Sequence, residues 1–188
     1  MAAQVFRFDA PERFVAGTVG QPGDRTFFLQ ARDATRLTSV VLEKEQVAVL
    51  AERLDVLLDE VLRRSGGEVA VPAVAPAGLD DLDPLEQPII EEFRVATLTL
   101  SWDIERGCVV IAAYAPREDD DDSEPPTDPE DADRDGLVVF LTGAQARAFA
   151  KRAQSLVTAG RPPCPLCGLP LDPAGHVCPR QNGYRRRG

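Results

Sequence analysis

The sequence predicts an α+β protein built from two similar halves, followed by a small C-terminal zinc-binding tail. Three observations lead to this prediction. Short apolar segments of strand-forming residues recur in two groups along the chain. A segment with apolar residues three or four positions apart, as in an amphipathic helix, closes each group. Three of the four cysteines lie close to the only histidine, near the C-terminus.

The first half is predicted to contain three main strands and one helix. Residues 14–19, 26–31 and 37–42 are rich in aromatic, β-branched and other apolar residues and are separated by turn residues. A shorter strand-like segment at residues 6–8 precedes them. Apolar residues then recur with 3–4 spacing, which predicts an amphipathic helix over about residues 43–64.

The second half repeats this order of elements. Residues 93–102, 107–113 and 137–141 are predicted strands. Thr142 is a suitable N-cap for a second helix, because its hydroxyl can accept a hydrogen bond from the first turn, and this helix is expected to end near residue 158.

The two halves can be aligned with each other. An offset of 99 residues aligns Gln46 with Gln145, together with the strands before them, and an offset of 79 residues aligns residues 14–19 with residues 93–98. We therefore expect two pseudo-repeated βββα units that form a mainly antiparallel sheet or barrel covered by the two helices. The alternative is that any strand followed by an amphipathic helix aligns loosely with another such pair.

Composition divides the chain into a body and a tail. The expected parts are a body (1–160) of two halves (about 1–67 and 89–160), a linker (68–88), an acidic insertion (about 116–136) and a tail (161–188). Four prolines in the linker argue against a long helix there. The acidic insertion is expected to be disordered, because its many carboxylates and prolines cannot form a core.

The charge and the hydropathy of the chain exclude some classes of function. A formal net charge of −10 argues against general nucleic-acid binding by the whole protein. The start of the chain lacks the apolar region of a signal peptide, and no apolar run is long enough to span a membrane. Clustered cysteines next to a histidine fit a metal in a reducing compartment better than secreted disulfides. We expect a cytoplasmic protein without membrane contact.

The tail contains a candidate zinc site. Cys164 and Cys167 form a Cys-x-x-Cys pair, and His176 and Cys178 follow as His-x-Cys. Three thiolates and one imidazole complete a tetrahedral set for zinc, which indicates a structural role because four protein ligands leave no open position for water. The alternatives are a redox Cys-x-x-Cys and thiols without a ligand.

A basic stretch follows these cysteines and is a candidate partner-binding segment. Its candidate contact residues are Arg180, Asn182, Tyr184, Arg185, Arg186 and Arg187. The expected partner is a protein, and nucleic acid is a weaker alternative because the stretch offers few cations and one aromatic ring. The stretch could also bind the chain's own acidic insertion or remain solvated.

Four stretches of the sequence resemble a known family. They are Cys164-Pro-Leu-Cys-Gly-Leu-Pro with Gly175-His-Val-Cys-Pro-Arg, Phe14-Val-Ala-Gly-Thr-Val-Gly-Gln-Pro-Gly, and Phe27-Phe-Leu-Gln-Ala. They are similar to an actinobacterial family of conserved hypothetical proteins, a domain of unknown function with a zinc-ribbon-like Cys/His tail. The resemblance implies a cytoplasmic protein with a metal-binding tail and carries no activity to transfer.

The sequence favours binding over catalysis. It contains no phosphate-binding loop of the P-loop type and no Gly-x-Ser-x-Gly nucleophile motif. Cys108 lies in an apolar segment and is expected to be a buried small residue. We therefore expect a non-catalytic protein-interaction or regulatory module whose zinc tail presents a docking surface. The alternatives are a nucleic-acid-binding protein that uses the same tail and an enzyme with a site between the two halves, near Trp102.

Overall fold

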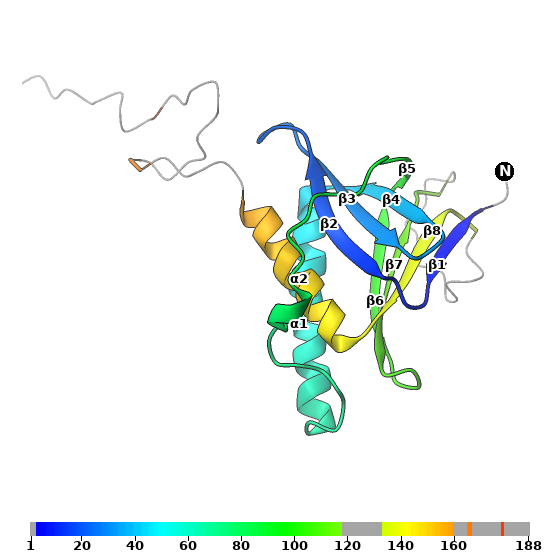
Figure 1. The fold of residues 1–188 in the computed structure, drawn as a ribbon, viewed down its shortest axis with the longest axis vertical. Helices are drawn as coiled ribbons and strands as arrows, with labels where there is room; N and C mark the ends of the chain where they lie inside the picture. The colour runs from blue at the N-terminus through cyan, green and yellow to red at the C-terminus, as the bar shows by residue number, and fades with distance from the viewer. Residues whose placement is uncertain (1–2, 118–132, 160–164, 167–177, 179–188) are drawn as a thin grey trace, which may run out of the picture.

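The computed structural model describes residues 3–117, 133–159, 165–166 and 178. In chain order the elements are β1 (Val5–Phe8), β2 (Arg13–Val19), β3 (Thr26–Arg32), β4 (Leu37–Leu42), α1 (Lys44–Ser65), the 3-10 helix η1 (Ala77–Leu79), β5 (Glu91–Arg94), β6 (Thr97–Asp103), β7 (Cys108–Tyr114), β8 (Gly136–Leu141) and α2 (Gly143–Thr158). The α+β class is confirmed, with two four-stranded sheets and two long helices (Figure 1).

The strands form two separate mixed sheets. Their orders are β1-β8-β7-β6 and β2-β3-β4-β5. Within each sheet three strands of one half are antiparallel, and the fourth strand, which comes from the other half, is parallel to its neighbour. Four of the six strand pairings are antiparallel, as expected, but the strands form two sheets and not one sheet or a closed barrel. Each half supplies only three antiparallel strands, and its short leading strand crosses to the other sheet.

The chain changes sheets within the segment that the sequence predicted as one strand, residues 93–102. The amide of Val95 donates to Val41 O at 2.7 Å in one sheet, and the amide of Ala96 donates to Tyr114 O at 2.8 Å in the other. The repeated unit is thus ββββα, with β1–β4 and α1 corresponding to β5–β8 and α2. The offset of 79 residues is consequently wrong, because β2 corresponds to β6 and not to β5.

The offset of 99 residues is confirmed by the ends of the repeated elements. β4 and β8 are each followed by a helix after a single N-cap residue, Glu43 in one half and Thr142 in the other. The side chain of Gln46 accepts a hydrogen bond from Glu43 N at 2.8 Å, and that of Gln145 accepts one from Thr142 N at 3.0 Å. The same local chemistry therefore starts both helices.

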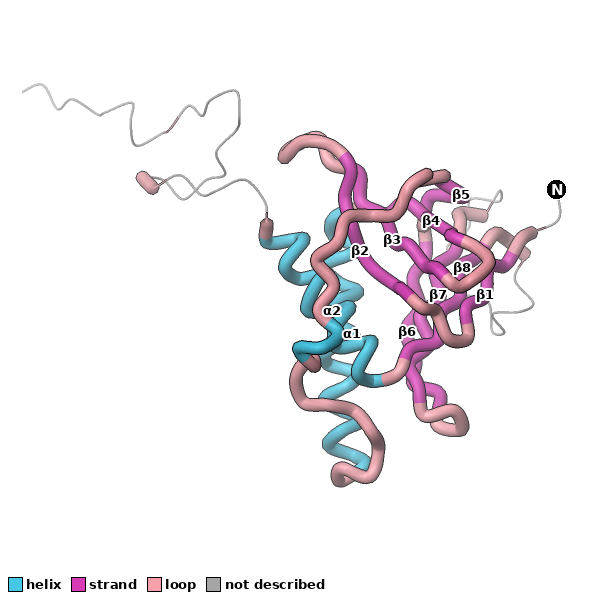
Figure 2. The backbone as a smooth tube through the Cα atoms, viewed as in Figure 1, coloured by secondary structure: helices cyan, strands magenta, loops and turns pink. Residues whose placement is uncertain are grey.

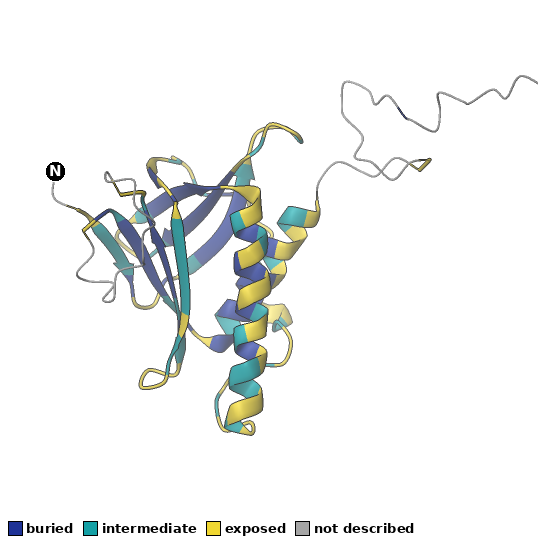
Figure 3. Cartoon of the chain, turned by 180° about the vertical axis from the view of Figure 1, so that it is seen from behind, coloured by how far each residue is buried: buried dark blue, intermediate teal, exposed yellow. Residues whose placement is uncertain are grey.

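Each helix packs against the sheet that contains the antiparallel strands of the other half. α1 follows β4 but contacts β6 of the other sheet, and α2 follows β8 but contacts β2. The helices also pack against each other and lie side by side on one side of the sheets (Figure 2). Their buried residues face the sheets and their exposed residues face outward (Figure 3). The main core lies between the two layers and includes Leu29, Val40, Leu54, Val139 and Phe149.

The expected linker, residues 68–88, packs against the body. Its residues 81–86, which we call the strap, cross the outer face of the sheet that contains β2. Leu85 is buried there with Val15, Phe28 and Val41. A Cβ at Gly17 would lie 2.5 Å from Leu85 Cγ, so the strap can approach β2 this closely only over a glycine.

The strap is also hydrogen-bonded to the sheet. The buried Gln30 side chain donates to Glu86 O at 3.1 Å and accepts from Glu86 N at 2.8 Å, so one side chain binds both backbone groups of a strap residue.

No helix among the described residues is long and apolar enough to cross a bilayer.

Leu85 should therefore contribute to stability, while the neighbouring Leu82 should not. Leu85→Ala removes a buried side chain and is expected to lower the free energy of unfolding by about 2 kcal/mol. Leu82→Ala is the matched control, because Leu82 is 92% exposed, and its change should stay within about 0.5 kcal/mol. Urea denaturation of both variants measures the difference, and equal stabilities would show that the strap does not hold the sheet.

Candidate functional site

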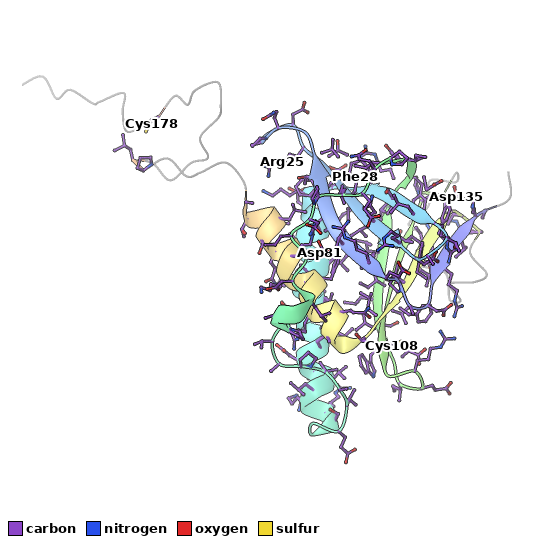
Figure 4. The ribbon with its side chains drawn as sticks, viewed as in Figure 1. Arg25, Phe28, Asp81, Cys108, Asp135 and Cys178 are labelled. Carbon is purple, nitrogen blue, oxygen red and sulfur yellow. The ribbon has the colours of Figure 1, made fainter. Side chains whose placement is uncertain are left out.

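Most of the predicted zinc ligands lie outside the described residues. Cys164, Cys167 and His176 belong to this group, as do the candidate partner-binding residues Arg180, Asn182, Tyr184, Arg185, Arg186 and Arg187. Cys178, labelled in Figure 4, is among the described residues. It is buried, with 3% of its surface exposed. In the part of the chain that the structure describes, no group of three or more His, Cys, Asp or Glu side chains is placed to hold a metal ion.

The tail continues from α2, and this helix is fixed by polar contacts to distant parts of the chain. Near its start, the side chain of Arg147 is only 5% exposed. Its guanidinium donates to Pro72 O at 3.1 Å and to Asp55 Oδ1 at 2.8 Å, and it also pairs with Asp59. This arginine therefore ties α2 to α1 and to the connection that follows α1.

A second arginine of α2 meets the strap. Arg152 donates to Ala16 O of β2 at 2.9 Å, to Asp81 Oδ1 at 2.8 Å and to Asp83 O at 2.7 Å. Asp81 lies beside α2 (Figure 4). The three acceptors lie on β2 and on the strap, so one side chain joins a helix of the second half to a strand of the first.

Arg13 of β2 binds the same carboxylate from the other side. Its Nε donates to Asp81 Oδ2 at 2.6 Å and its Nη2 donates to Asp81 Oδ1 at 2.9 Å, which is the two-bond geometry that guanidinium and carboxylate groups favour. The side chains of Arg13 and Arg152 are 11% and 14% exposed. Two largely buried guanidinium groups thus converge on one carboxylate.

Further charges extend this network along the strap. Arg32 donates to Glu86 Oε1 at 2.9 Å and also pairs with Glu12. A hollow of about 120 Å³ lies next to the network, with the apolar side chains of Phe14, Leu141 and Phe149 in its wall. Every arginine here has a carboxylate partner, so the network acts as an anchor for the strap.

The network keeps its carboxylate ionised. The hydrogen bond from Arg13 lowers the pKa of Asp81, and the positive charges of Arg13 and Arg152 act in the same direction. The hydrogen bond with Asp81 raises the pKa of Arg13. Burial lowers the pKa of Arg152 against the opposing effect of Asp81. A carboxyl group with a lowered pKa is a poor general acid at neutral pH.

The residues considered for catalysis lie elsewhere. Trp102 packs against the main core. Cys108 is at the start of β7, and burial raises the pKa of its thiol, which disfavours the nucleophilic thiolate. Arg13, Arg152 and Asp81 were not singled out from the sequence, because their partners are 68 or more residues away along the chain. The only feature of the local sequence that pointed to this network is the run of acidic residues in the strap.

Removal of the Asp81 charge should destabilise the protein in a pH-dependent manner. Asp81→Asn leaves two largely buried guanidinium groups without their shared partner, at an expected cost of about 2 kcal/mol at neutral pH. Because the folded pKa is below the ordinary value of 3.8, this contribution is present above about pH 4 and is lost as the pH falls through the folded pKa. Urea denaturation at pH 7 and pH 3 measures it.

Asp80→Asn is the matched control. Asp80 pairs with Lys151, an exposed residue of α2, the helix that also carries Arg152. Exposed ion pairs of this kind contribute at most about 1 kcal/mol to stability. If Asp80→Asn and Asp81→Asn cost the same at pH 7, the convergence of Arg13 and Arg152 on Asp81 has no special role.

Comparison with known proteins identifies a family. No curated protein and no solved structure gives a significant match to the chain. The model of the family described as "Protein of unknown function (DUF3090)" matches residues 6–178, a range that includes all four candidate zinc ligands and ends before the basic stretch. The match describes neither a taxon nor a metal site, and it confirms the expected assignment to a domain of unknown function. The chain belongs to the DUF3090 family.

Proposed function

We propose that the protein is a non-catalytic protein-interaction module in which a structural zinc ion folds the C-terminal tail into a docking surface. The zinc ligands in this proposal are Cys164, Cys167, His176 and Cys178. Their chemistry fits the metal, because thiolate sulfur and imidazole nitrogen are preferred zinc ligands. The matched family range includes all four of these residues.

The anchoring of α2 is the observation that carries this proposal. Contacts from α1, β2 and the strap all fix this helix. Arg25, which follows the β2–β3 turn, donates to Ala159 O at 3.0 Å. A docking element needs a rigid base, because disorder in the base adds an entropic cost to binding. Two residues separate the candidate tail from the end of this anchored helix.

The role of zinc in this proposal is to supply folding free energy. A tail of this length cannot bury enough apolar surface to fold independently, and metal binding can replace a core in such small units. The basic residues after Cys178 lie outside the matched family range, so the proposed docking role of Arg180 to Arg187 rests on the sequence of this chain alone.

Metal analysis tests the zinc site. The purified protein in reducing buffer should contain one zinc ion per chain, measured by atomic emission, and Cys164→Ser should lose it because three donors hold zinc much more weakly. Cys108→Ser is the matched control, since Cys108 lies on β7 in the body, and it should retain one zinc ion. Protein without zinc, or equal loss in both variants, would contradict the site.

Site-specific cross-linking tests the docking surface. A photo-cross-linking amino acid in place of Tyr184 should give a discrete protein adduct in cells, and the adduct should disappear when Cys164→Ser is added. The same amino acid in place of the exposed Leu82 of the strap controls for random encounters. An adduct that persists without zinc would refute the zinc-dependent surface. The alternative, a nucleic-acid partner, predicts a different result. The adduct would then be sensitive to nuclease and would be lost when alanine replaces Arg185, Arg186 and Arg187.

A further inference from the structure

Arg25 and Lys44, near the end of α2, have no carboxylate partner among the described residues, whereas most cations there have one. Among the described residues, every arginine and lysine pairs with an Asp or Glu side chain except Arg25, Lys44 and Arg53. The chain as a whole carries a formal charge of −10, so carboxylates are abundant. The absence of a partner at Arg25 and Lys44 therefore needs a physical explanation.

Arg25 and Lys44 line the same hollow. Its volume is about 240 Å³, and its wall is completed by Phe27, Leu156, Val157 and the β2–β3 turn. Arg25 follows that turn, Lys44 begins α1, and the two aliphatic residues lie in the last turn of α2.

No acidic side chain is among the described residues that line this hollow. Two acidic residues adjoin these cations in the sequence, but neither lines the hollow. Glu43, next to Lys44, pairs with Arg94 at 2.7 Å. Asp24, next to Arg25, is exposed. The hollow therefore combines two positive charges with an apolar wall.

We propose that this hollow binds a small phosphate monoester, with Arg25 and Lys44 holding the phosphate group. A dianion balances both charges, whereas a monocarboxylate would balance only one. Arginine and lysine are the usual phosphate-binding side chains, and their hydrogen bonds to an oxyanion are charge-assisted. Phe27, Leu156 and Val157 provide an apolar surface for the organic part of the ligand.

The position of this site links it to the tail. Arg25 uses Nη1 to bind Ala159 O, the C-cap of α2, and its other guanidinium N–H groups have no acceptor among the described residues. A phosphate held by those groups would contact the same side chain that fixes the end of α2. The ligand would thus occupy the point at which the body continues into the tail, without using any residue of the tail.

Calorimetric titration of the zinc-loaded full-length protein at low ionic strength tests this site. Inorganic phosphate should bind with one site per chain, and phenyl phosphate should bind more tightly because its ring can cover the apolar wall. Acetate should bind much more weakly than phosphate. Arg25→Gln and Lys44→Gln should each weaken phosphate binding about tenfold, as expected for the loss of one charge-assisted hydrogen bond.

Arg53→Gln is the matched control, because it removes the same charge from the exposed part of α1 outside the hollow. It should leave phosphate affinity unchanged. Lys44→Gln breaks no hydrogen bond of the fold described above, so it gives a result even if Arg25→Gln disturbs α2. Cys164→Ser should retain phosphate binding, which separates this site from the proposed zinc tail. Absence of saturable binding, or equal weakening in Arg53→Gln, would overturn the proposal.

Discussion

The exchange of β1 and β5 between the two sheets is the constraint on which the rest of the structure depends. Without it, β4 and β8 would be sheet edges with unpaired backbone groups, directly beside the buried core. The exchange also explains why neither half is a separate domain, because each sheet is complete only with a strand of the other. In this arrangement α1 contacts β6 in the sheet of the second half and α2 contacts β2 in the sheet of the first half. The two helices therefore lie side by side.

The shared Asp81 carboxylate is the second organising feature, because it connects three separate parts of the fold. Arg13 reaches it from β2 and Arg152 reaches it from α2, while Leu85 and Glu86 hold the same strap on the sheet. Buried ion pairs contribute little net stability when they replace apolar packing, but the loss of one partner is costly. The network therefore specifies where the strap lies more than it increases overall stability.

The polar contacts of α2 hold its C-terminal end in place next to the proposed functional sites. The helix is fixed along its length by Arg147, Lys151 and Arg152, and at its end by Arg25. The proposed zinc tail and the proposed phosphate site meet at this end, yet they use different residues and different chemistry. A ligand in the hollow would thus contact Arg25, the residue that also binds the C-cap of α2.

The sequence by itself determined the α+β class, the order of most elements, the starts of both helices and the Cys/His cluster. These features depend on local periodicity, capping residues and ligand spacing, which are readable within a few residues, as at Thr142 and Gln145. Only the tertiary structure decided the strand exchange, the path of the strap and the convergence of Arg13 and Arg152 on Asp81. Those contacts join residues that are far apart in the chain, and no local pattern marks which of many arginines and carboxylates will meet.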